Sequence, residues 1–218
     1  GPEWSCSIDD AVLEARRLVE EGHRELVLTG IHLGHYRPSL LPLLKEIEKI
    51  PGLDRIRLSS IESIEVTDEL IDWAATSPKA CAHFHLPLQS GSDSVLRAMR
   101  RPYTSAEFAE VVERVRARMP LAGITTDLIV GFPGESDEQF AETLKFLEQI
   151  QFSRIHIFKF SRRDGTPAAD MQNQVNNAVK ALRSNQVETV WHRSAQNFYL
   201  RFIGQELEVL WETIDNGL

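Results

Sequence analysis

The sequence predicts an α/β protein in which parallel strands are covered by helices. Five apolar segments of strand length alternate with segments whose apolar residues recur at helical spacing. Each predicted strand is apolar along most of its length, which is typical of a parallel sheet. These two observations leave open whether the sheet closes into a barrel, forms part of a barrel, or is an open doubly wound sheet.

The first half of the chain places two strands between three helices. The first helix ends at Gly22, a residue that is common just after a helix. Asp68 and Glu69 favour the start of the third helix, because acidic side chains are stabilised at a helix N-terminus. The elements are a helix at 8–21, a strand in the segment 25–34 that closes on Gly30, a helix at 40–50, a strand at 55–63 and a helix at 67–75.

The second half continues the alternation with three strands and two helices. Both helices begin with a capping box, in which a Ser or Thr and the Glu or Gln three residues later satisfy each other's backbone N–H groups. The pairs are Thr104 with Glu107 and Ser136 with Gln139. The segment 81–93 is predicted to be a strand that runs into a Ser/Gly turn, the other strands are predicted at 123–132 and 154–161, and the helices at 105–118 and 137–150.

A long helix from 175 to about 200 follows the last of these strands. Its candidates for the buried side are Val175, Val179, Leu182, Val187, Val190 and Trp191. Beyond Gly204 the residues 205–212 alternate as in a strand, and no later segment pairs with it. Because a single strand cannot satisfy its own backbone, the chain is expected to stop shortly after a second domain begins.

Composition excludes several classes of protein. The 218 residues are 42% hydrophobic and 26% charged, enough for one substantial core. A formal charge of −8 argues against a strongly basic surface for nucleic acid. No run has the length of a membrane span and no signal peptide is visible, so a cytoplasmic location is expected. Cys6 and Cys81 are too few for a disulfide framework and too far apart in sequence for a local metal-ligand pair.

The segment TDLIVGFPGES, at 126–136, is predicted to be a strand that changes abruptly into a helix. Gly131 and Gly134 allow a backbone to approach a ligand closely, and a helix N-terminus offers free N–H groups. The segment is neither a GxGxxG fingerprint nor a P-loop. From its residues alone it indicates either a ligand-binding turn or a tight connection.

Polar or glycine-containing sequence follows every predicted strand. In parallel α/β structures the carboxyl ends of the strands share one face, where sites are built. Lys159, Arg162 and Arg163 follow the last strand and suit an anionic ligand such as a carboxylate or phosphate. Asp127 and Glu62 are acids of the same rim that either accept hydrogen bonds from a ligand or pair with arginines.

Two other groups of residues are weaker candidates. His83 and His85 alternate along one strand and so share a face. No third ligand is predicted beside them, so we expect no metal site but ring nitrogens bonded to neighbours inside a barrel. Arg97, Arg100 and Arg101 are either a phosphate-binding patch or a solvated helix end.

Five motifs, taken in order, resemble the tRNA methylthiotransferases of the radical S-adenosylmethionine class. They are VLTGIHLGHY, RIRLSSIE, HFHLPLQSGSDSVLRAMRRPYT, ITTDLIVGFPGES and FKFSRRDGTPAA. The resemblance covers about 8–212. TGIHLG and RLSSIE most resemble the branch that acts on threonylcarbamoyladenosine. The isopentenyladenosine branch, the ribosomal-protein branch and a non-catalytic RNA-binding barrel module are the alternatives, and a barrel lyase using Lys159 is a weaker one.

The resemblance implies a partial (β/α) barrel that binds S-adenosylmethionine across its strand ends. In such enzymes a [4Fe–4S] cluster cleaves the cofactor to a radical, and a second, auxiliary [4Fe–4S] cluster serves sulfur insertion. The product carries a methylthio group at C2 of N6-threonylcarbamoyladenosine at position 37 of tRNA, next to the anticodon. The implied division is a barrel core at 1–172, a linker helix at 173–202, and at 203–218 the start of a truncated TRAM-like β-domain that binds RNA.

The resemblance also implies roles for residues of the rim. Thr29 and Gly30 would meet the methionine end of the cofactor, Gln89 to Ser92 its ribose, and Gly131 to Glu135 its adenine. The cofactor-binding residues implied are Thr29, Gly30, Ser59, Glu62, Gln89, Ser90, Gly91, Asp127, Gly131, Pro133 and Gly134. The substrate-binding residues implied are Lys159, Arg162, Arg163 and Thr166. No catalytic residue and no metal ligand is assigned.

The sequence departs from the family at the cluster motif. The family's C-x-x-x-C-x-x-C run is absent, and iron–sulfur clusters need thiolate ligands. The chain is therefore interpreted as a fragment that is inactive by itself, with its clusters bound elsewhere in the full-length enzyme. Gly1-Pro2 is either a protease scar or native sequence. The expected partners are tRNA and S-adenosylmethionine, with no membrane, and the oligomeric state is left open.

Overall fold

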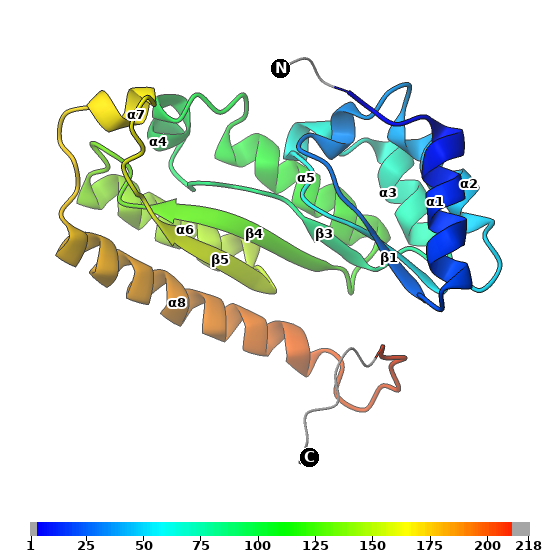
Figure 1. Ribbon diagram of the computed structural model, residues 1–218. Helices are drawn as coiled ribbons and strands as arrows, with labels where there is room; N and C mark the ends of the chain where they lie inside the picture. The colour runs from blue at the N-terminus through cyan, green and yellow to red at the C-terminus, as the bar shows by residue number, and fades with distance from the viewer. Residues whose placement is uncertain (1–3, 211–218) are drawn as a thin grey trace, which may run out of the picture.

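A computed structural model describes residues 4–210 and forms a curved, entirely parallel arrangement of strands (Figure 1). The strands are β1 (Glu25–Leu28), β2 (Arg55–Leu58), β3 (His83–His85), β4 (Gly123–Val130) and β5 (Arg154–Lys159). β1 pairs with β2, and β3 and β5 flank β4. Single bridges from Ile56 to Ala80 and from Ser60 to His85 join the two groups. Spatial order thus follows chain order without reversal, which fits part of a barrel and excludes the doubly wound alternative.

Helices follow the strands along the outside of this array. They are α1 (Ile8–Glu20), α2 (Leu40–Glu48), α3 (Asp68–Thr76), α4 (Asp93–Ala98), α5 (Ser105–Arg118), α6 (Asp137–Ile150), α7 (Pro167–Asp170) and α8 (Asn177–Leu200), with short 3-10 turns η1 (Leu33–His35) and η2 (Ser63–Glu65). Both predicted capping boxes are present, at Thr104 with Glu107 and at Ser136 with Gln139. α8 packs along β5 and α6 (Figure 1).

The core lies between the strands and these helices. Along β4, Ile124, Leu128 and Val130 are buried, and they join one hydrophobic cluster with the helices. Phe108 of α5 contacts the ring of Phe152, with centroids 6.0 Å apart. The alternate residues of the same strands face the other way, so the two faces of the array differ in chemistry.

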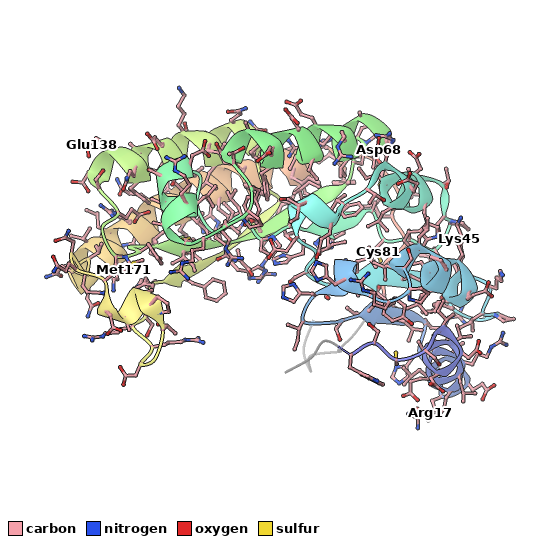
Figure 2. The ribbon with its side chains drawn as sticks, turned by 90° about the horizontal axis from the view of Figure 1, so that it is seen from above. Arg17, Lys45, Asp68, Cys81, Glu138 and Met171 are labelled. Carbon is pink, nitrogen blue, oxygen red and sulfur yellow. The ribbon has the colours of Figure 1, made fainter. Side chains whose placement is uncertain are left out.

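The molecule is extended along the direction in which the strands follow one another. Figure 2 shows Glu138 and Met171 at one end of the view and Arg17 and Lys45 at the other. No helix among residues 4–210 is long and apolar enough to cross a bilayer.

Two sequence predictions differ from the structure. The segments 25–34, 55–63 and 81–93 contain strands of only four, four and three residues, and Ser60 and Gln89 beyond these strands make isolated bridges. The strand predicted at 205–212 is wrong for residues 205–210, which are exposed and have no regular structure. Residues 211 and 212 lie outside the described part, as does half of the predicted C-terminal domain at 203–218.

Candidate functional site

The carboxyl ends of the five parallel strands form a common rim. Thr29 and Gly30 follow β1 and are exposed, and Ser59 follows β2 and is partly buried. Gln89 follows β3 with a left-handed backbone, φ 69°. For a residue other than glycine this conformation costs free energy, and such strain is concentrated at functional sites. The structure thus places the predicted residues on one rim, while their contacts differ from residue to residue.

Glu62 is an acid of this rim in which one carboxylate oxygen pairs with an arginine and the other is buried without a partner among the described residues. Its Oε1 lies 3.3 Å from Nη1 of Arg101. Its Oε2 is buried and has no hydrogen-bond partner among the described residues. Burial raises the pKa of Glu62, and Arg101 opposes that shift. The buried oxygen is an acceptor for a ligand's N–H or O–H group, and Arg101 is tied to this acid instead of lying on a solvated helix end.

A row of polar side chains crosses the inner face of β3 and β4. The ring nitrogens of His83 and His85 lie 3.0 and 2.8 Å from Thr125 Oγ1. Nε2 of His85 lies 3.3 Å from Asp127, and its ring meets that of His156 edge-on at 5.6 Å. The prediction that these histidines share a face and bond to neighbours is confirmed. Asp127 is partnered by a histidine, a pairing that the sequence analysis did not foresee.

Acid is expected to destabilise the fold through His83. Burial, followed by repulsion from Arg57, lowers the pKa of His83 to about 4. The unfolded chain therefore binds this proton first, and stability falls as the pH drops from about 6.5 to 4. By pH 5 the loss is about 2 kcal/mol. Denaturant unfolding from pH 7 to pH 4 should give a shallower dependence in His83→Gln, and an identical dependence would contradict this assignment.

The glycine turn after β4 is held by its own carboxylate. Gly131 N–H donates to Glu135 Oε2 at 2.7 Å, and both Gly131 and Gly134 have positive φ angles, 73° and 81°. The Glu135 side chain is 1% exposed. Burial raises its pKa, whereas the Gly131 N–H and Arg183 act in the opposite direction. The Gly131 N–H is thus already used and is not available to a ligand.

Two basic residues of α8 hold this turn from outside. Arg183 Nη1 donates to Glu135 Oε2 at 2.7 Å and to its backbone oxygen at 3.1 Å, and Nη2 donates to Asp137 at 2.7 Å. Lys180 Nζ donates to the carbonyl of Phe160 at 2.9 Å. Both basic side chains are buried, which is rare unless they are paired.

The side-chain direction at Gly131 is filled by Lys180. A Cβ added at Gly131 would overlap Cγ of Lys180 and lie 3.2 Å from its Cδ. A side chain at position 131 would therefore meet α8 and would not project into open space at the rim. Gly131 is needed because α8 passes over it, and the assignment of the Gly131–Pro133–Gly134 turn to the cofactor stays a prediction.

The Ser90–Gly91 turn is packed against α6. Ser90 Oγ lies 3.3 Å from Thr143 Oγ1, and Gly91 N–H donates to the same hydroxyl at 3.2 Å. A Cβ at Gly91 would lie 2.8 Å from Cβ of Phe146. The glycine thus allows the turn to approach a helix, and the Ser90 side chain is buried. Their predicted contact with a cofactor remains untested.

The loop after β5 carries exposed cations. Lys159, Arg162 and Arg163 are all exposed, and Thr166 Oγ1 donates to the carbonyl of Arg163 at 2.7 Å. The loop leads into α7 at Pro167, so both its ends are attached to regular structure. A group of accessible cations at the rim suits an anionic partner.

Sequence reasoning missed Lys180 and Arg183. It placed Leu182 on the buried side of the long helix, and this is wrong because Leu182 is 60% exposed. The buried positions include Lys180, Arg183, Val187, Val190 and Ser194. Their spacing of three and four residues is the helical signal, and it was overlooked because two members are basic.

The strand order, the helical cover and the rim together define a partial (β/α) barrel. Residues 1–147 match the family model described as the radical SAM superfamily, and the chain belongs to that superfamily.

Solved structures share this fold. Coproporphyrinogen III oxidase (HemN) from Escherichia coli, described as a radical SAM enzyme, aligns over 86% of this chain and 46% of its own, with a TM-score of 0.62 and 16% identity. Methylornithine synthase (PylB) aligns over 89% of this chain and 55% of its own, with a TM-score of 0.64 and 13% identity. At these identities the likeness concerns the fold alone.

Curated relatives are more similar in sequence. The threonylcarbamoyladenosine tRNA methylthiotransferases MtaB of Bacillus subtilis and Thermotoga maritima are 39% and 43% identical to this chain over 93% and 91% of its length. The tRNA-2-methylthio-N(6)-dimethylallyladenosine synthase of Thermobifida fusca is 42% identical over 96% of it. The chain spans about half the length of these relatives, covering 46%, 47% and 44% of them.

The superfamily implies S-adenosylmethionine and an iron–sulfur cluster as cofactors, and this chain fits the first only. The rim offers an unpartnered carboxylate oxygen at Glu62 and accessible backbone at Thr29 and Gly30, as an ammonium and ribose hydroxyls require. A cluster needs several thiolates, and the chain has only Cys6 and Cys81. Burial raises the pKa of Cys81 and so favours its neutral thiol. The residues of this chain do not fit a cluster, and no step is derived through one.

Proposed function

We propose that this chain is the barrel core of a tRNA methylthiotransferase that binds S-adenosylmethionine at the rim and acts on an adenosine of tRNA. The observation that carries the proposal is the identity of about 40% to relatives of this activity over more than nine-tenths of the chain. When bound, S-adenosylmethionine supplies the methyl group and the adenosyl radical source of this reaction class. A cytoplasmic location follows from the tRNA substrate.

Within this activity we favour threonylcarbamoyladenosine as the substrate. The relatives include both the threonylcarbamoyl and the dimethylallyl enzymes, so identity alone does not separate the two. A threonyl group carries a carboxylate, whereas a dimethylallyl group is apolar. Lys159, Arg162 and Arg163 at the rim match the former, because Arg and Lys side chains bind carboxylates through charge-assisted hydrogen bonds.

The proposal is tested on the whole protein that contains this chain. Expressed in a bacterial strain that lacks its own methylthiotransferases but makes both precursor nucleosides, it should add a methylthio group to threonylcarbamoyladenosine. Mass spectrometry of digested tRNA measures this product. Exclusive modification of dimethylallyladenosine would contradict the substrate assignment, and no modified nucleoside from a cluster-loaded protein would contradict the activity.

Charge reversal of the rim loop is expected to weaken substrate use selectively. Arg162→Glu together with Arg163→Glu should raise KM for tRNA about tenfold or more, the loss typical of removing charge-assisted contacts to an anion. Both residues are exposed, so folding should be unaffected. Arg16→Glu with Lys45→Glu, on α1 and α2, is the matched control with an equal change of charge. An equal rise in KM for both pairs would show that the effect comes from the net charge of the protein and not from the rim loop.

A further inference from the structure

Two imidazoles and one carboxylate converge beside the rim, at the turns that follow β1 and β2. His32 directly precedes the short η1 turn, His35 is its last residue, and Glu65 is the last residue of η2. One ligand atom from each residue lies within 4.8 Å of the other two. The two imidazole rings are stacked, with centroids 5.2 Å apart and planes at 18°. The group is made by two loops about thirty residues apart, so only the fold brings it together.

The carboxylate of this group is fixed in place. Glu65 accepts the backbone N–H of Glu62 at 3.1 Å through Oε2, and its Oε1 lies 3.1 Å from Nε2 of His35. Its side chain is 8% exposed, whereas that of His35 is 48% exposed. The acid is therefore oriented by a backbone hydrogen bond, and the imidazole of His35 lies directly beside it. Outer hydrogen bonds of this kind orient the ligands of metal sites.

A glycine permits the approach of the two loops. A Cβ at Gly34 would overlap the carboxylate and Cβ of Glu65. Any residue other than glycine at position 34 would push Glu65 away from the two histidines. The segment His-Leu-Gly-His, residues 32–35, thus contains two nitrogen ligands and also the glycine that lets the carboxylate of Glu65 reach them.

We infer that His32, His35 and Glu65 bind a divalent transition-metal ion, with zinc as the best match. Two imidazoles and one carboxylate are a zinc donor set, whereas Mg²⁺ and Ca²⁺ prefer oxygen ligands only. Zinc at about 2.1 Å from each atom needs them about 3.3 Å apart. Nε2 of His35 and Oε1 of Glu65 are already 3.1 Å apart, and all three ligand atoms lie within 4.8 Å of one another.

Three protein ligands leave a fourth position for water or a ligand atom. His32 and His35 also line a cavity of about 1210 Å³ that extends along β1 and includes Thr29 and Gly30. The open position of the ion therefore faces a space large enough for a small molecule. Because the set contains no thiolate, this site is distinct in chemistry from an iron–sulfur site.

The test is a titration of this chain with zinc, measured by calorimetry. A second titration uses Co²⁺ as a substitute for zinc and is measured by its visible absorption. One ion per chain is expected in the parent. Affinity should fall by at least about tenfold in His32→Ala and in Glu65→Gln, as loss of a ligand costs no less than loss of an outer partner. Gln keeps an oxygen that accepts the Glu62 N–H, so this variant retains the turn. Circular dichroism at equal temperature checks that each variant is folded.

Two further variants separate this site from unspecific binding. His192→Ala removes an exposed histidine that is paired with Glu188 at 3.6 Å on α8, and it should leave zinc affinity unchanged. Cys6→Ser removes the thiol that lines the same cavity, and it should leave the cobalt spectrum unchanged. The inference is overturned if the folded parent binds no stoichiometric ion, or if His32→Ala and Glu65→Gln bind as the parent does, or if only Cys6→Ser abolishes binding.

Discussion

Replacing Arg183 with alanine is expected to lower the free energy of unfolding by about 3–5 kcal/mol. The guanidinium is buried against Glu135, and its removal leaves a carboxylate that is 1% exposed without its cation. Glu135 in turn holds the Gly131 N–H, so the loss spreads to the glycine turn. In the whole protein we expect the affinity for S-adenosylmethionine to fall with it. Chemical denaturation of the chain measures the first effect, and equilibrium binding the second.

Arg193→Ala is the matched control on the same helix. Arg193 pairs with Glu148 at the surface, where both side chains are more than half exposed. Such pairs contribute about 1 kcal/mol or less. If both alanine variants unfold at the same denaturant concentration, Arg183 does not fix the turn. Arg183→Lys should recover little, because lysine lacks the planar fork that reaches Glu135 and Asp137 together.

Gly131→Val is expected to cost about 2–6 kcal/mol of stability. About 1–3 kcal/mol comes from the left-handed backbone, φ 73°, and about 1–3 kcal/mol from overpacking against Lys180. The variant should therefore lose activity because it unfolds more readily, not because a side chain blocks the cofactor. Thermal unfolding of the chain with activity measured on the whole protein distinguishes these two causes. A variant of normal stability and no activity would restore the blocking interpretation.

Gly134→Val separates strain from overpacking. Gly134 has a similar angle, φ 81°, but a Cβ there meets nothing within 4 Å. It should show the backbone cost alone. In a Lys180→Ala background the Cγ that fills the space above Gly131 is gone, so Gly131→Ala should cost less than in the parent. A coupling free energy near zero between positions 131 and 180 would contradict their packing.

Local signals in the sequence predicted much of the fold. The capping boxes at Thr104 and Ser136 and the glycines after strands depend only on neighbouring residues, so they are visible without tertiary contacts. The alternation of His83 and His85 gave their common face for the same reason. The predicted strand segments were too long because apolar residues such as Ile31 and Ile61 follow the paired residues but lie in the loops after β1 and β2.

Contacts over long sequence separations explain what was missed at the site. Lys180 and Arg183 are buried because of acceptors 20 and 48 residues away, and a helix read by itself assigns such residues to solvent. The partner of Glu62 is 39 residues away at Arg101, and the histidines that meet Glu65 lie on another loop. Polar burial of this kind follows from the whole fold. The only signal in the sequence is that these basic residues recur at the same three- and four-residue spacing as the buried apolar residues of α8.

The direction of α8 sets a distance that the rest of a longer protein would have to cover. The helix begins at the rim and ends by the opposite edge of the strands, where Phe198 approaches Gly123 and Arg201 bonds to the carbonyl of Pro120. Its 24 residues span about 36 Å at 1.5 Å per residue. A segment that leaves residue 203 and reaches back to the rim needs about eleven extended residues for the return alone. Shortening that stretch below this length would keep any domain beyond it away from the rim, while leaving the barrel intact.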